Sequence, residues 1–221
     1  MAIEYLKRGI SDQKRSEDDA NTAKIVSQTL LDIEERGDQA VRELAVKFDG
    51  FDRDNYKLSQ TEIQQIISKV SDDDMRDLKF AQEQVRNFAE AQRESMRDIE
   101  VETMPGVILG HKNIPVQSVG CYVPGGKFPM VASAHMSVAT ASVAGVPRII
   151  ACTPPFNGEP NPAVIAAIHL GGAHEIHVLG GIQAVGAMAL GTETIEAVPV
   201  SYTHLRAHET VLDLVCRLLL E

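Results

Sequence analysis

Apolar side chains recur at helical spacing through residues 17–96, set among many charged residues. Gly37 interrupts the spacing and predicts a boundary between two helices. Ser59, followed three residues later by Glu62, is typical of a capping box and predicts a helix that runs through residue 70. Ser71 precedes three aspartates, and a helix N-terminus favours such negative charge. The pattern therefore predicts four helices that act as a scaffold.

The pattern changes near residue 99, where glycines and prolines become frequent. Short β-type runs then alternate with longer segments of small apolar residues, and each run ends at a glycine or proline turn. The predicted strands are 116–123, 148–153 and 175–179, and the predicted helices are 130–145, 161–170 and 182–190.

A strand–helix unit repeated in this way is typical of a parallel sheet with right-handed crossovers. The predicted fold class is therefore α/β, with a helical segment over residues 1–98 and an incomplete Rossmann-like βαβαβα sheet over residues 99–198. Ligands bind such sheets at the carboxyl ends of the strands. The candidate loops are Pro124-Gly125-Gly126, Thr153-Pro154-Pro155 and Gly180-Gly181.

Composition narrows the class of protein. The chain has 221 residues, of which 44% are hydrophobic and 24% charged, which is enough for a core and unlike a disordered chain. The net charge of −10 disfavours nucleic-acid binding. No apolar run is long enough to cross a membrane, and the N-terminus lacks the apolar core of a signal peptide. We expect a cytoplasmic protein.

Three cysteines lie far apart, which fits neither a disulfide framework nor a zinc cluster. Cys121 and Cys152 are predicted to be small buried hydrophobic residues, and the third is Cys216. The odd number and the wide spacing agree with a reducing compartment.

Neither GxGxxG nor GxxxxGK[ST] occurs, so the usual dinucleotide and P-loop fingerprints are missing. Two glycine pairs, Gly125-Gly126 and Gly180-Gly181, lead from strand ends into helices whose N-termini could face an anion. Such pairs are more often simple turns. Lys127 could attract a sulfonate or a pyrophosphate, or could be an ordinary exposed loop lysine.

The longest motifs lie at these strand ends, with further matches in the helical segment. They are GCYVPGG at 120–126, ASA at 132–134, CTPP at 152–155, GGIQA at 180–184, RGDQA at 36–40 and KFD at 47–49. Together they resemble the histidinol dehydrogenase family over about residues 3–198.

Within that family the sequence is most similar to a side branch that oxidises small sulfonated diols, the sulfopropanediol 3-dehydrogenases. The matching features are Cys121 before the tyrosine, the ASA-x-M pattern from Ala132 to Met136, and Phe88-Ala89 where histidinol enzymes usually have Phe-His.

The resemblance implies an NAD-dependent oxidation of a primary alcohol, through an aldehyde, to a carboxylate by a zinc-bearing homodimer. It also implies that Tyr122 and Gln183 contact NAD. The Tyr122 ring could pack on the cofactor while its hydroxyl donates a hydrogen bond, and the Gln183 amide could reach the ligand crevice. The alternative for Tyr122 is an ordinary half-buried aromatic at a strand end.

The histidines do not predict a metal site. His135 lies on an apolar helix, where a core or interface histidine is more common than a ligand. His169, His174 and His177 flank a glycine pair, but their spacing matches no zinc motif.

The family pattern stops after about residue 198, and residues 199–221 resemble the translation of a sequencing adapter joined to a truncated gene. We expect a non-native tail that contains an orphan amphipathic helix. His204 and His208 are four residues apart, but Glu209 follows the second histidine rather than the first, so the metalloprotease pattern is not met.

In the family, the zinc ligands and the Glu-His acid/base pair lie downstream of this point. We therefore expect an N-terminal fragment without catalytic or metal-binding residues, inactive in isolation. Two alternatives remain: a non-catalytic module that binds a nucleotide or anion, and a non-functional fragment with an unpaired strand edge.

Overall fold

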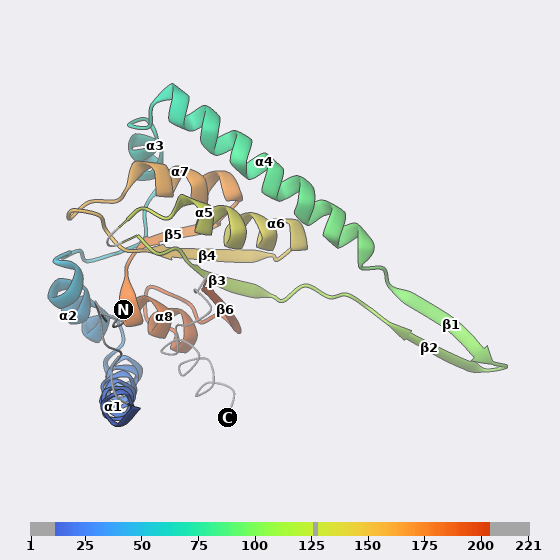
Figure 1. Ribbon diagram of the computed structural model, residues 1–221, viewed down its shortest axis with the longest axis horizontal. Helices are drawn as coiled ribbons and strands as arrows, with labels where there is room; N and C mark the ends of the chain where they lie inside the picture. Colours follow the sequence, from blue (N-terminus) through green and yellow to red (C-terminus); the bar gives the residue numbers. More distant parts are fainter. Residues whose placement is uncertain (1–11, 126–127, 204–221) are drawn as a thin grey trace, which may run out of the picture.

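The computed structural model describes residues 12–125 and 128–203 (Figure 1). Its first part consists of the four predicted helices, α1 (Asp12–Arg36), α2 (Asp38–Asp49), α3 (Gln60–Ile67) and α4 (Asp72–Ser95). The predicted capping box is confirmed, because the Ser59 side chain and Glu62 form it. Helix α4 begins with the three aspartates as predicted, and the Ser71 side chain caps it. Helix α3 ends earlier than predicted, at Ile67, because residues 68–70 form a turn.

The second part is a four-stranded parallel sheet with the strand order β5-β4-β3-β6. The predicted alternation of strands and helices is confirmed. Its elements are β3 (Ser118–Tyr122), α5 (Val131–Ala134), the π-helix η1 (His135–Ala139), α6 (Thr140–Ala144), β4 (Arg148–Thr153), α7 (Pro162–Gly171), β5 (Glu175–Val178), α8 (Gly181–Leu190) and β6 (Val200–Thr203). The α/β fold class, with helices followed by a parallel sheet, is therefore confirmed.

Helices cover both faces of the sheet (Figure 1), and the strands β3, β4 and β5 are largely buried. Alternate residues of β4 point to opposite faces. Ile149 and Ala151 join an apolar cluster with α3, α4, α5, η1 and α7, and Ile150 and Cys152 join another with α1, α2 and α8. This burial explains why β4 reads as a nearly continuous apolar run rather than as an alternating one.

The sheet contains a strand that the sequence analysis did not predict. Residues Val200–Thr203 pair parallel to β3 as β6, beyond the predicted boundary at residue 198. The strand edge of β3 is therefore paired at this position, unlike the unpaired edge considered for a non-functional fragment. The remaining predicted tail, with His204, His208 and Glu209, lies outside the described residues.

A second unpredicted feature is an antiparallel hairpin of β1 (Ile99–Met104) and β2 (Val107–His111). All residues of both strands are exposed, and the hairpin projects beyond the end of α4 (Figure 1). In the sequence this region was marked only by its frequent glycines and prolines. None of the helices in the described part of the chain is both long and apolar enough to cross a membrane.

Candidate functional site

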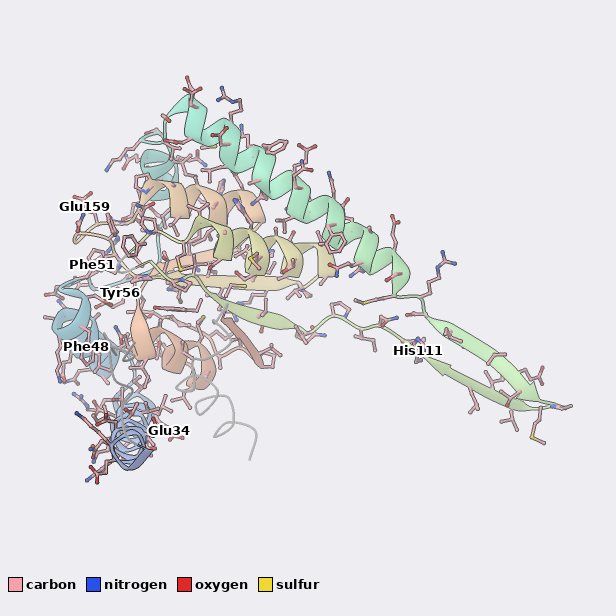
Figure 2. The ribbon with its side chains drawn as sticks, in the orientation of Figure 1. Glu34, Phe48, Phe51, Tyr56, His111 and Glu159 are labelled. Carbon is pink, nitrogen blue, oxygen red and sulfur yellow. The ribbon has the colours of Figure 1, made fainter. Side chains whose placement is uncertain are left out.

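The candidate site lies at the edge of the sheet where the parallel strands end. Strands β3, β4 and β5 finish at Tyr122, Thr153 and Val178. Helix α8 begins directly after β5, and its first residue contacts the last residue of β3. The C-terminal end of α2 reaches the same edge, where Figure 2 shows Phe51 and Tyr56 close to one another, with ring centroids 6.2 Å apart.

Tyr122 joins the end of β3 to the start of α8. Its hydroxyl oxygen accepts a hydrogen bond from the Gly181 backbone N–H at 3.0 Å. Burial raises the pKa of the phenol, so the hydroxyl keeps its proton at neutral pH. Because that oxygen acts as acceptor toward Gly181, its own O–H is left to donate to a ligand.

Gln183 is fully buried in the first turn of α8. Its Nε2 donates to Oδ2 of Asp49 at 3.0 Å. Its Oε1 is buried and accepts no hydrogen bond from any described residue. An unpaired buried acceptor costs on the order of 1–3 kcal/mol, so this oxygen is a strong candidate for ligand contact.

Asp49 is a site residue that the sequence analysis missed, because it appeared there only within the KFD match. It is the last residue of α2 and is half-buried against the Gly180-Gly181 turn. Burial raises the pKa of its carboxyl group, while hydrogen bonds from the Gly180 backbone and from Gln183 oppose the rise. One signal was available: a carboxylate at a helix C-terminus opposes the macrodipole, which favours cations there.

The same contacts change the interpretation of the second glycine pair. The N–H of Gly181 donates to Tyr122, and Gly180 lies against the carboxylate of Asp49. The Gly181 N–H at the start of α8 is therefore already paired within the protein, and a carboxylate lies next to Gly180. These contacts favour a simple turn over an anion site, whereas Gln183 Oε1 has no partner among the described residues. Lys127, the other candidate for an anion, lies outside the described residues.

His135 is buried in η1, as predicted for a core histidine. Its Nδ1 lies 3.3 Å from Nε2 of Gln82, a side chain of α4 that also donates to the carbonyl of Ala167 in α7. Burial lowers the pKa of His135, which favours the neutral ring. This pair links α4 to two neighbouring helices, away from the carboxyl edge.

The other three histidines do not converge. His169 lies in the last turn of α7, His174 accepts a hydrogen bond from the Ile149 backbone at 3.0 Å, and His177 is buried within β5. Within the described ranges, no group of three or more His, Cys, Asp or Glu side chains could hold a metal ion.

Cys121 and Cys152 are buried and unbridged, as predicted. Burial raises the pKa of Cys121 to about 12 and that of Cys152 still further, so both remain neutral thiols. Neither has the lowered pKa of a nucleophilic cysteine, and both act as apolar packing.

A parallel sheet with helices on both faces is the architecture of the α/β proteins, which bind their ligands at the carboxyl edge of the sheet. The family model described as histidinol dehydrogenase matches residues 12–201. The chain belongs to the histidinol dehydrogenase family.

Similar proteins and a solved structure support this family assignment. The chain is 55% identical over 195 residues to a histidinol dehydrogenase homolog of Shouchella clausii, covering 88% of this chain and 46% of that protein. It is 44% identical to a sulfopropanediol 3-dehydrogenase of Ruegeria pomeroyi, covering 86% of this chain and 43% of the relative. The crystal structure of histidinol dehydrogenase from Elizabethkingia anophelis superposes with a TM-score of 0.81 at 29% identity, covering 97% of this chain and 47% of the other. The chain thus spans about half the length of these relatives.

Proposed function

We propose that the chain forms the cofactor-binding part of an NAD-dependent dehydrogenase that oxidises a small primary alcohol, through an aldehyde, to a carboxylate. Family membership supports a dehydrogenase. The observation that carries the assignment of the site is Gln183, whose buried Oε1 has no partner among the described residues. It lies against Gly181, which hydrogen-bonds Tyr122, at the edge where such sheets bind ligands.

The two side chains suit complementary roles toward NAD. The Tyr122 O–H can donate to the cofactor, and Gln183 Oε1 can accept from a ribose hydroxyl or from the carboxamide N–H₂. Both are held by hydrogen bonds to backbone or side chain, which limits the rotational freedom lost on binding. Bound NAD would supply the hydride acceptor for the oxidation.

We assign zinc and the acid/base pair to the part of the family's length that this chain does not span. The described residues offer no cluster that fits a zinc ion, so no step of the reaction is derived through it. In this proposal the full-length protein is a cytoplasmic homodimer, and the isolated chain binds NAD without turnover.

A sulfonated diol is slightly favoured over L-histidinol as the substrate. The support is the 44% identity to the protein named sulfopropanediol 3-dehydrogenase, against 41% to a histidinol dehydrogenase of Methanosarcina barkeri. The second candidate function is a non-catalytic nucleotide- or anion-binding module. The parallel pairing of β6 on β3 favours it over a fragment with an open edge at that position.

Calorimetric titration of the full chain with NAD tests the cofactor proposal. We expect saturable 1:1 binding, and about tenfold weaker binding for Tyr122→Phe, which removes the donor hydroxyl. Thr140→Val is the control, because it also removes a single hydroxyl, one that donates to the Met136 carbonyl within the helical segment of η1 and α6. Absence of binding to the wild-type chain, or equal losses in both variants, would contradict the assignment.

A further inference from the structure

Asp49 occupies a position that helix physics disfavours. A carboxylate in the last turn of α2 lies at the negative end of the helix dipole, and the C-cap Gly50 follows it in the left-handed conformation (φ 60°). Partial burial adds a desolvation cost, which is visible in the raised pKa of Asp49. A residue that opposes two local preferences needs a compensating role, and such conflicts concentrate at functional sites.

The partners of Asp49 show what that role is. An ionised carboxylate only accepts hydrogen bonds, whereas the two ends of a glutamine amide differ, one donating and one accepting. Asp49 Oδ2 lies 3.0 Å from Gln183 Nε2, so it fixes which end of this buried amide faces α2. Gln183 Oε1 must then point away from Asp49, which agrees with its lack of a partner among the described residues.

The Gly180-Gly181 turn leaves room for this arrangement. A Cβ at Gly180 would lie 3.1 Å from both carboxylate oxygens of Asp49, and a Cβ at Gly181 would lie 2.8 Å from Gln183 Oε1. The carboxylate and the amide oxygen are thus packed directly against bare backbone. Their positions are set by three elements, α2, the turn after β5, and α8.

We propose that Asp49 is a positioning residue that holds the Gln183 amide with its oxygen presented to the cofactor. The inference rests on the proposed function, since it takes NAD as the ligand of that oxygen. Asp49 acts through Gln183 and makes no cofactor contact of its own in this account. Asp49, 134 positions earlier in the chain than Gln183, therefore determines which atom of the Gln183 amide can accept a hydrogen bond from NAD.

The decisive variant is Asp49→Asn, which keeps the shape and introduces an amide. The new side chain can accept from the Gly180 N–H through its oxygen and donate to Gln183 through its nitrogen, which turns Gln183 Nε2 toward the ligand. We expect NAD affinity to fall about tenfold, because a donor replaces the required acceptor. Asp52→Asn is the matched control, since Asp52 lies three residues later and pairs with exposed Arg42. We expect it to leave NAD affinity unchanged.

A second readout follows the amide without NAD. In the full chain labelled with ¹⁵N-glutamine, the Gln183 side-chain N–H₂, identified by its loss in Gln183→Met, is expected to be protected from exchange. In Asp49→Asn that protection should disappear, while thermal unfolding stays within a few degrees of wild type. A merely structural Asp49 would instead lower the unfolding temperature without changing the amide signal or the affinity of the folded protein.

The outcomes separate this inference from the proposed function. If the wild-type chain binds NAD and Asp49→Asn binds it equally well, the positioning role is wrong and the cofactor site stands. If the wild-type chain does not bind NAD, the proposed function fails and the positioning role toward NAD fails with it. If Asp49→Asn does not fold, Asp49→Ala, Gln183→Ala and the double variant are measured instead. Losses of NAD binding free energy that add up in the double variant would overturn the inference, because a residue that acts through another gives non-additive losses.

Discussion

The carboxyl edge of the sheet and the β1–β2 hairpin are both made of short strands with glycine turns, yet they differ in what holds them. At the edge, Tyr122, Gln183 and Asp49 come from three elements and are fixed by contacts between distant parts of the chain. In the hairpin, Ile108 and its neighbours pair only with the opposite strand and remain exposed. An isolated hairpin of this kind is at best marginally stable in water.

The difference shows that β-strand pairing and burial are separate properties of this chain. Strand β4 is paired on both sides and covered on both faces, so its side chains contribute to global stability. The hairpin is paired but uncovered, so it should open locally without unfolding the sheet. Four measurements test this contrast, in decreasing order of expected effect.

The largest effect is expected from Ile150→Ala, compared with Ile108→Ala. Both are strand isoleucines, but Ile150 is 0% exposed and Ile108 is 63% exposed. Removing the buried side chain should lower the free energy of unfolding by about 2–5 kcal/mol, and the exposed one by less than about 1 kcal/mol. Urea unfolding measures both. Equal losses of unfolding free energy would mean that the hairpin side chains are buried in solution, which would contradict the difference between the sheet and the hairpin.

The next effect is the acid sensitivity caused by His177 in β5. Burial lowers its pKa from 6.5 to about 4, although nearby Glu175 partly opposes the shift. The unfolded chain binds the proton more readily, so stability should fall as the pH drops from 6.5 to about 4, by up to about 3 kcal/mol. In His177→Gln that part of the pH dependence should be missing. A parallel loss in both proteins across this range would refute the assignment.

A smaller effect is expected from two Gly→Ala changes. One introduces a steric clash of the new Cβ, and the other introduces backbone strain at a positive φ angle. At Gly180 the φ angle of −109° suits alanine, but the new Cβ would lie 2.6 Å from Pro154 Cβ. At Gly106, in the hairpin turn, there is open space but φ is +81°, which costs L-residues roughly 1–2 kcal/mol. Gly180→Ala should lower global stability by about 1–3 kcal/mol and weaken NAD binding.

Gly106→Ala should affect only the hairpin and leave NAD binding unchanged. Thermal unfolding combined with NAD titration distinguishes the two variants. Unchanged NAD affinity in Gly180→Ala would show that the turn after β5 is not part of the binding edge. A loss of NAD affinity in Gly106→Ala would show that the hairpin contributes to binding.

The smallest effect is expected from Glu102→Ala. Glu102 Oε1 accepts a hydrogen bond from the Gly106 N–H at 2.7 Å, an exposed contact worth less than about 1 kcal/mol. Hydrogen exchange should become faster in β1 and β2 while the global unfolding midpoint is unchanged. Glu100→Ala serves as the control within the same strand, opposite Gly110. A shift of the midpoint in Glu102→Ala would mean that the hairpin unfolds together with the sheet.

Local signals in the sequence predicted most of the fold. The Ser59 capping box, the acidic start of α4, the break at Gly37 and the apolar run of β4 each depend on residues close in sequence. They could therefore be identified without tertiary information. The hairpin was missed because its apolar residues have no buried face that would enforce a clean alternation. Strand β6 was missed because only its pairing on β3 defines it.

For the site, the sequence by itself located Tyr122 at the end of a predicted strand and Gln183 just after the Gly180-Gly181 pair, at the start of a predicted helix. Only the tertiary structure decided what they contact. The Tyr122–Gly181 and Asp49–Gln183 hydrogen bonds join residues 59 and 134 positions apart, and nothing in the local pattern specifies such distances. Hydrophobic periodicity assigns each element a buried face, whereas the partner of a buried polar group depends on which elements the folded sheet brings together.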